Sequence, residues 1–261
     1  MPHLNKIRTL WDAGQPVANG WLSMGSAFAA EIYAGAGFDC VTLDLQHGMN
    51  GIAEMVSCLQ AVRAAGVTPM VRVPSLEPAI ISKALDAGAL GLICPMISTP
   101  EQARMLVAQT KYPPRGERSS GPTRASLIYS GDYFEQADAQ IVVIAMIETQ
   151  EGVDNLDAIC RTPGLDAVYI GPSDLTLALA GGRLKPGPDR QEPEMIEAIQ
   201  AIIAGAHAAG IRAGLHCGSS DYAAKAVGWG ADLVTLTADV PMLARAAHAT
   251  VRTFREQVAA G

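Results

Sequence analysis

Short apolar runs alternate with longer amphipathic segments along the whole 261-residue chain. Most of these runs are continuously apolar, which is the pattern of parallel strands buried on both faces. The pattern predicts eight strands, at residues 17–24, 39–44, 68–72, 90–94, 142–147, 167–170, 211–215 and 232–236.

Segments rich in Ala, Leu, Glu and Gln lie between these runs and indicate helices. Several of them end in the pair Ala-Gly just before the next strand. Glycine in that place supplies the left-handed residue that ends a helix without a steric penalty. The clearest predicted helices are residues 26–36, 52–65, 78–87, 100–110, 194–209 and 241–257.

Eight strand–helix units without a break in composition predict an α/β protein with a single (β/α)₈ TIM barrel over residues 1–261. An open doubly wound sheet is the competing architecture, but no GxGxxG sequence follows the first strand. Two stretches that carry prolines and glycines depart from the rhythm, 111–134 and 181–193. We expect loops there, and a loop as long as the first is usually functional or interfacial.

Composition narrows the class of protein. Apolar residues make up 49% of the chain and the net charge is −7 without a basic stripe, so we expect a large core and no nucleic acid partner. The five cysteines lack metal-binding spacing, and no apolar run reaches the length of a membrane span. Residues 1–11 have no apolar signal-peptide core, so a cytoplasmic protein without a membrane partner is expected.

Polar residues gather where the predicted strands end, and in a barrel these ends share the face that carries active sites. The residues are Asp44, Gln46 and His47 after the second strand, Arg72 at the third, Glu148 after the fifth, Gly171-Pro172-Ser173-Asp174 after the sixth and His216 after the seventh. A base, a cation and two acids are therefore predicted to meet at one mouth.

Glu148 and Asp174 come from neighbouring strands, so their carboxylates can approach each other. Two carboxylates with open positions for water or substrate suit Mg²⁺, Mn²⁺ or Co²⁺ better than a closed zinc site. The alternative is that both acids stabilise helix N-termini, because each precedes a helical segment. Backbone N–H groups of Ser173 and Asp174, at such a helix start, can bind a substrate carboxylate.

Arg72 follows a buried strand, where its planar fork suits a carboxylate or an enolate oxygen. The alternative is a structural ion pair in the barrel mouth. His47 lies three residues after Asp44, and a hydrogen bond from its ring to that carboxylate would fix the tautomer of a general base. The alternative is a histidine satisfied by backbone groups.

The remaining histidines and arginines offer weaker candidates. His216 is ambiguous, and His3, His207 and His248 lie in a terminus or on Ala-rich helices, outside the expected site. In the stretch 111–134, Arg118 and Arg124 are candidates for binding a carboxylated aldehyde, with solvated or interfacial arginines as the alternative.

Six segments of the chain, in order, resemble the HpcH/HpaI aldolase family. They are AGAGFDCVTLDLQHG at 34–48, VRVP at 71–74, LDAGALGLICPM at 85–96, KYPPRGERSSG at 111–121, AMIETQEGVDNLDAI at 145–159 and DAVYIGPSDL at 166–175. The set is far more specific than any one motif. The resemblance implies a TIM-barrel aldolase that assembles as a homohexamer, a trimer of dimers in which C-terminal helices are exchanged.

The resemblance also implies a role for each candidate residue. Glu148 and Asp174 fall on the metal ligands, Arg72 on the arginine at the keto oxygen, and His47, with Asp44, on the acid–base histidine. Substrate contacts are expected at Arg72, Gln46, Gly171, Ser173, Asp174 and, at the edge of the site, Trp21. One departure stands out, because the family commonly has Asp-x-Glu-His where this chain has Gln46 in the third position.

The implied activity is class II aldol chemistry: cleavage of a 4-hydroxy-2-oxo acid into pyruvate, or hydroxypyruvate, and an aldehyde. A divalent metal then serves as Lewis acid. A Schiff-base route would need a lysine at a strand end, and the sequence places none there. The alternatives are a related decarboxylase of the oxaloacetate type and a non-catalytic barrel that binds a keto acid.

Overall fold

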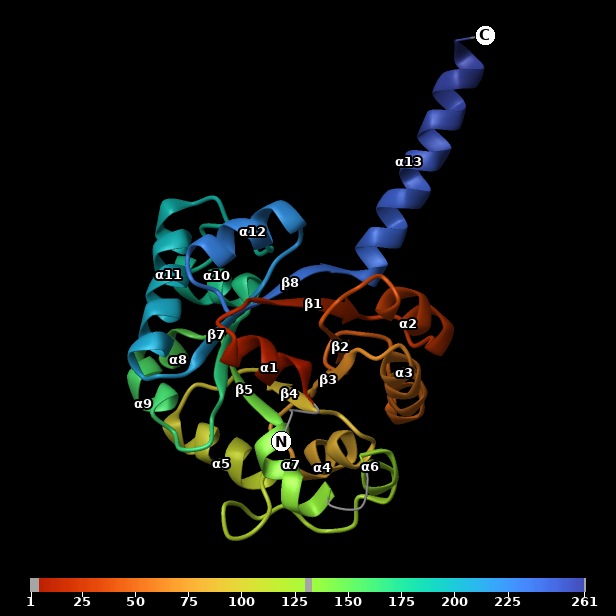
Figure 1. Cartoon of the computed structure of the whole chain (residues 1–261). Helices are drawn as coiled ribbons and strands as arrows, with labels where there is room; N and C mark the ends of the chain where they lie inside the picture. Colours follow the sequence, from red (N-terminus) through yellow and green to blue (C-terminus); the bar gives the residue numbers. More distant parts are fainter. Residues whose placement is uncertain (1–4, 130–132, 261) are drawn as a thin grey trace.

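The computed structural model describes residues 5–129 and 133–260. In this part of the chain, eight parallel strands close into a barrel in sequence order, with β8 paired to β1 (Figure 1). The strands are β1 (Val17–Leu22), β2 (Cys40–Asp44), β3 (Thr68–Arg72), β4 (Gly91–Cys94), β5 (Val142–Ile147), β6 (Ala167–Ile170), β7 (Arg212–His216) and β8 (Leu233–Ala238). The predicted (β/α)₈ barrel is confirmed, with strand ends shifted by no more than two residues.

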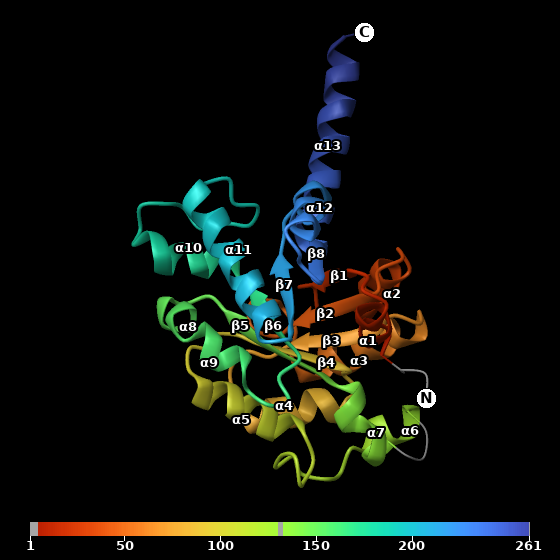
Figure 2. The ribbon, with the colours of Figure 1, turned by 60° about the vertical axis from the view of Figure 1, so that its left-hand side comes forward.

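Helices surround the barrel and connect successive strands (Figure 2). In the described residues they are α1 (Lys6–Asp12), α2 (Ala27–Ala34), α3 (Ile52–Ala64), α4 (Pro78–Asp86), α5 (Pro100–Thr110), α6 (Thr123–Ile128), α7 (Tyr133–Gln140), α8 (Gln150–Asp154), α9 (Leu156–Cys160), α10 (Pro172–Ala180), α11 (Pro193–Ala208), α12 (Ser220–Gly228) and α13 (Asp239–Ala259). None of these described helices is both long and apolar enough to cross a lipid bilayer.

We expected a continuous loop at residues 111–134, and this prediction is wrong. Helix α6 and the start of α7 lie within the stretch. A six-residue helix is too short to display an amphipathic period in the sequence, and tertiary contacts hold it instead. At its end, the Tyr129 hydroxyl donates to the Gly88 carbonyl at 2.6 Å. Residues 130–132, like His3, lie outside the described residues. The loop predicted from residue 181 is confirmed up to the start of α11.

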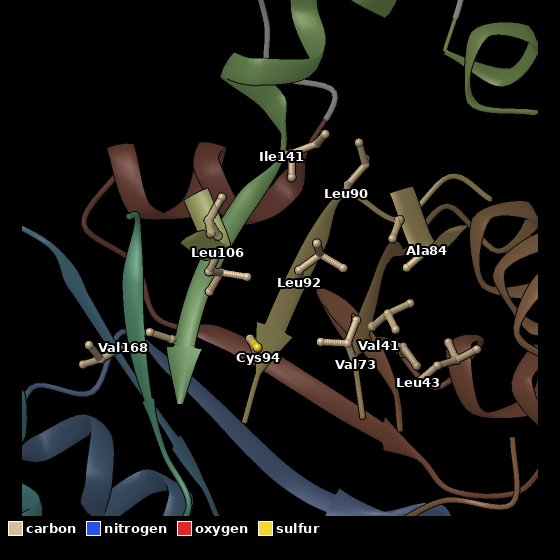
Figure 3. Packing of buried hydrophobic residues seen from close by; sticks show 14 of the residues in the cluster. Val41, Leu43, Val73, Ala84, Leu90, Leu92, Cys94, Leu106, Ile141 and Val168 are labelled. Atoms are coloured by element: carbon tan, nitrogen blue, oxygen red, sulfur yellow. The ribbon is translucent and has the colours of Figure 1, made fainter. Parts of the chain in front are cut away.

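Two separate apolar clusters form the core because side chains on each strand alternate between the two faces of the barrel wall. The larger cluster lies between the strands and the helices, where Val41 and Leu92 of the strands pack near Ala84 and Leu106 of the helices (Figure 3). The smaller cluster fills the barrel interior and includes Met70, Ile144 and Tyr169. Ile7 and Trp11 of α1 belong to the same interior cluster.

The interior positions become polar at the carboxyl ends of the strands. Asp44 and Arg72 occupy paired positions of β2 and β3, so their side chains leave the sheet on the same side. Trp21 is two positions after Asn19 on β1 and follows the same inward alternation. The barrel wall therefore brings residues that are distant in sequence to one mouth.

The C-terminal helix α13 projects away from the barrel in both views (Figures 1 and 2). Its first residue, Asp239, is buried and accepts hydrogen bonds from the backbone N–H groups of Ser23 and Met24 at 2.9 and 3.0 Å. The rest of α13 is largely exposed, including Leu243 and Phe254. The predicted C-terminal helix is confirmed, and its apolar residues find little cover in its own subunit.

Candidate active site

A cavity of about 250 Å³ opens at the carboxyl ends of the strands. Its walls combine groups from β1, β2, β3, β5, β6, β7 and β8 and their following loops. The lining residues are Trp21, Ser23, Asp44, His47, Arg72, Met146, Gly171, Pro172, Ser173, Asp174, His216 and Ala238. The structure thus brings together most of the residues that the sequence placed at strand ends.

Arg72 and Asp44 form a bidentate ion pair in the wall of this cavity. Arg72 Nε donates to Asp44 Oδ1 at 2.9 Å, and Nη2 donates to Oδ2 at 2.6 Å. Both side chains are buried. Burial alone would raise the pKa of Asp44, but the hydrogen bonds and charge of Arg72 outweigh it, so the pKa of Asp44 is lowered. Asp44 is therefore ionised and holds Arg72 in one orientation.

Trp21 completes this corner of the cavity. Its indole Nε1 donates to Asp44 Oδ2 at 3.3 Å, and the Arg72 guanidinium carbon lies 4.8 Å from the centroid of its ring. A cation over an indole face is attracted by the ring quadrupole. Trp21 is almost fully buried, so it acts here as a rigid wall behind Arg72.

His47 lies at the exposed rim of the cavity. The predicted hydrogen bond from its imidazole ring to Asp44 is absent from the described residues. Asp44 Oδ1 accepts from the backbone N–H groups of Gln46 and His47, at 3.0 and 3.2 Å, and not from the imidazole. Among the described residues, the His47 ring has no hydrogen-bond partner. The two oxygens of Asp44 are already taken by Arg72, Trp21 and these amides, so the turn after β2 positions His47 through its backbone.

Glu148 is a buried carboxylate, and one of its two oxygens has no hydrogen-bond partner in the described residues. Its Oε1 accepts from the backbone N–H of Met96 at 2.9 Å, whereas Oε2 has no partner in the described residues. Burial, together with the negative charge of Asp174, raises the pKa of Glu148 to about 7, against the opposing effect of the Met96 hydrogen bond. A buried carboxylate oxygen without a donor is costly unless a cation or proton meets it.

Gly171 leaves room for this carboxylate. A Cβ on that residue would collide with Glu148 Oε2 and with the methyl group of Met146. The glycine is also the N-cap of α10, with Pro172 at the first helical position. Because the chain turns here without a side chain, Glu148 can lie against the start of the helix.

Asp174 lies in the first turn of α10, beside free backbone amides. Within the described residues, the N–H groups of Ser173 and Asp174 make no hydrogen bond, as expected at a helix start. Asp174 and the orphaned oxygen of Glu148 fit a divalent cation that keeps open positions for water or substrate. The described residues contain no group of three or more His, Cys, Asp and Glu side chains that could hold a metal ion.

Arg118 does not belong to the cavity, and its predicted role in substrate binding is wrong. Its guanidinium is fully buried, paired with Asp86 at 2.9 Å and bonded to the Tyr133 hydroxyl at 3.1 Å. Asp86 is the last residue of α4, which precedes the amino end of β4, so the pair lies at the opposite end of the barrel. Arg124 is at the same end, bonded to the Ala87 carbonyl. The sequence could not reveal the path of this segment.

Two groups at the cavity were given no role from the sequence. His216, left ambiguous, lines the cavity, and burial together with the charge of Arg72 lowers its pKa to about 4. Tyr169, read only as part of an apolar strand, lies beneath it with its hydroxyl 3.1 Å from His216 Nδ1. The alternation of β6 places Tyr169 on the same face as Gly171, and that signal could have found it.

The mouth of this parallel barrel holds the buried carboxylate of Glu148, the half-buried Asp174, an oriented arginine and free helix amides, a set of groups that suits an active site for a small anion. The family model described as HpcH/HpaI aldolase/citrate lyase matches residues 19–246. The chain belongs to this family. The resemblance seen in the six sequence segments is confirmed.

Relatives and solved structures agree with this assignment. The hydroxypyruvate/pyruvate aldolase of Rhizorhabdus wittichii RW1 is 40% identical over 97% of this chain and 99% of its own. The 5-keto-4-deoxy-D-glucarate aldolase of Escherichia coli K12 is 34% identical over 97% of both chains. A crystal structure of a family member from Burkholderia cenocepacia J2315 has a TM-score of 0.87 at 36% identity, covering 95% of this chain and 98% of that one. The protein is an aldolase, a carbon–carbon lyase.

Proposed function

We propose that this protein is a divalent-metal-dependent aldolase that reversibly cleaves 4-hydroxy-2-oxo acids into pyruvate, or hydroxypyruvate, and an aldehyde. The observation that carries the proposal is the unpartnered oxygen of the buried Glu148 beside Asp174, at the mouth that also holds Arg72. The names of two relatives, the hydroxypyruvate/pyruvate aldolase and the 5-keto-4-deoxy-D-glucarate aldolase, support the proposal that one substrate is a keto acid.

Glu148 and Asp174 hold the metal in this proposal. A bound divalent cation supplies Lewis-acid polarisation of the keto acid. Mg²⁺, Mn²⁺ and Co²⁺ all suit a site of carboxylates and water. Gly171 keeps the space in which the Glu148 carboxylate lies, so the metal site depends on a residue without a side chain.

The other residues bind the substrate and manage its charge. The free amides of Ser173 and Asp174 bind the carboxylate of the keto acid at the start of α10. Arg72 keeps N–H groups beyond the two that it gives to Asp44, and these stabilise the negative charge that develops on the keto oxygen. His47, at the open rim of the cavity, transfers the proton between the substrate hydroxyl and solvent.

The test is pyruvate release from a racemic 4-hydroxy-2-oxo acid, before and after EDTA treatment and again with each metal restored. We expect activity to disappear on chelation and return with metal. Glu148→Gln should abolish both activity and metal binding, measured by titration calorimetry, while Glu151→Gln on the exposed side of α8 should retain both. Activity that survives complete metal removal contradicts the proposal. Decarboxylation of oxaloacetate without aldol cleavage would instead support the decarboxylase alternative.

We also propose that the protein is a homo-oligomer, a hexamer in which α13 packs on a second copy of the chain. The support is an apolar stripe at helical spacing along this exposed helix, made of Val240, Leu243, Ala247, Val251, Phe254 and Val258. Such a face is unfavourable in water. The double substitution V251E/F254E should shift the mass measured by light scattering to a smaller species, whereas the control Arg252→Glu should not.

A further inference from the structure

A chain of hydrogen bonds runs from the centre of the barrel to the cavity. It starts at Asn19 on β1, passes through Thr235 on β8 and Tyr169 on β6, and ends at His216 on β7. Asn19, Thr235 and Tyr169 are fully buried. Buried polar groups of this kind must satisfy one another, so the direction of each hydrogen bond can be worked out.

Asn19 sets the direction. Its Oδ1 accepts from the Thr42 hydroxyl at 3.0 Å and from the Cys40 thiol at 3.2 Å. Its amide nitrogen donates to Thr235 Oγ1 at 2.8 Å. Because Thr235 receives this hydrogen, its own hydroxyl proton is free to be donated elsewhere.

The proton of Thr235 has one acceptor within reach among the described residues, the Tyr169 oxygen at 2.6 Å. Tyr169 is the largest fully buried side chain, and burial raises its pKa well above the ordinary value, so its hydroxyl keeps its proton. Having accepted from Thr235, the Tyr169 hydroxyl donates to His216 Nδ1 at 3.1 Å. The proton of a neutral His216 is thereby placed on Nε2.

The surroundings of His216 show what its Nε2–H can meet. The ring lines the cavity, and its edge-on neighbour is the Trp21 indole, 4.7 Å between centroids. Met146, Pro172 and Ala238 are further apolar groups in this lining. Among the described residues, no protein group accepts a hydrogen bond from Nε2, and Nε2 is not one of the buried unpartnered atoms, so the cavity can reach it.

We infer that His216 is a specificity-determining residue, held by Tyr169 as the Nε2–H tautomer, which donates a hydrogen bond to a hydroxyl oxygen of the substrate. This inference rests on the proposed function for the identity of the substrate. The carboxylate and keto oxygens have their own partners in the α10 amides and Arg72, which leaves a hydroxyl group for a neutral donor. An unsubstituted methyl group at this point would leave the N–H unpaired once water is displaced.

The hydroxyl group has two possible sources, the keto acid and the aldehyde, and the experiment separates them. One series compares kcat/KM for hydroxypyruvate and pyruvate with the same aldehyde. The other compares glycolaldehyde and acetaldehyde with the same keto acid. For His216→Phe, we expect the hydroxylated member of one series to lose about 10- to 100-fold in kcat/KM, the effect of one lost hydrogen bond to a buried donor. The kcat/KM of the unsubstituted member should change by less than about threefold, because that substrate has no hydroxyl group to lose the hydrogen bond.

His216→Gln is the matched variant, because glutamine keeps an N–H donor and should recover much of the preference. Equal losses for hydroxylated and unsubstituted substrates in both series, or no loss in either, overturn the inference. A protein inactive with every substrate would contradict the proposed function instead.

The tautomer itself can be observed without any substrate. In ¹⁵N-histidine-labelled protein, two-bond ¹H–¹⁵N spectra distinguish a protonated from an unprotonated ring nitrogen, and His216→Phe identifies the signal. We expect His216 to be protonated at Nε2 alone, and Tyr169→Phe to shift it toward a mixture of tautomers. A proton on Nδ1 in the unaltered protein overturns the assignment.

Discussion

Arg72 and Asp44 face each other across the β2–β3 pairing and are joined by two parallel hydrogen bonds of 2.9 and 2.6 Å. The ion pair is buried, yet it lines the cavity. The two alternatives predicted for Arg72, a structural ion pair and a substrate-binding group, are therefore compatible with each other. Asp44 fixes the plane of the guanidinium, and the remaining N–H groups are presented to the substrate.

Removing the carboxylate should leave a buried, unpaired cation. For Asp44→Ala we expect the free energy of unfolding to fall by about 3–5 kcal/mol, because the desolvated guanidinium loses its partner. Denaturant unfolding measures this change. The exposed pair of Asp157 and Arg161 provides a control, since Asp157→Ala should have no measurable effect. A small loss for Asp44→Ala would mean that water reaches Arg72 freely.

Gly171→Ala tests the space around Glu148. The added methyl group collides with the Glu148 carboxylate, so the metal-binding oxygen must move. We expect metal affinity and kcat/KM to fall by about 10- to 100-fold, the effect of disturbing the support of a metal ligand. Gly121→Ala is the control, because a Cβ at that position meets nothing within 4 Å. Unchanged metal affinity in Gly171→Ala would argue against Glu148 as a ligand.

Glu148 should make the stability of the EDTA-treated protein depend on pH. Its pKa is about 7 in the folded protein against 4.5 ordinarily, so between these values the folded state binds the extra proton. This contribution is present in full below pH 4.5 and is lost as the pH rises through 7, a change of about 3 kcal/mol.

His216 has the opposite effect on the pH dependence of stability, because its pKa falls from 6.5 to about 4 on folding. The stability that this group contributes is lost as the pH falls below 6.5. The two effects partly cancel in the unaltered protein. The measurement is therefore the difference in unfolding free energy between Glu148→Gln and the unaltered chain, from pH 4.5 to 8. We expect the advantage of the variant to grow with pH; a difference that does not vary with pH would contradict the assigned shift.

Arg118 should matter for stability and not for catalysis. Arg118→Met removes the buried partner of Asp86 and Tyr133, and we expect the free energy of unfolding to fall by about 2 kcal/mol with kcat/KM unchanged. The exposed Arg115→Met is the control. A selective loss of activity toward carboxylated aldehydes would restore the role first expected of Arg118.

The barrel could be predicted from the sequence because its signals are local. A strand buried on both faces leaves a continuous apolar run, and a helix that ends in Ala-Gly marks the next strand. Once eight such units were recognised, the position of Arg72 and Asp174 in the cavity wall, and of Glu148 beside Gly171 of that wall, followed from the shared polarity of parallel strands. The family assignment from six sequence segments is confirmed as well.

The partners of these side chains were decided only by the closed barrel. The sequence placed Asp44 beside His47, but the pairing of β2 with β3 sets it opposite Arg72. Tyr169 and His216 meet because β6 and β7 are neighbours in a particular register. The path of residues 111–129 carries Arg118 to the far end of the barrel. Hydrophobic period is a property of a few consecutive residues, whereas register and loop path depend on how the whole wall packs.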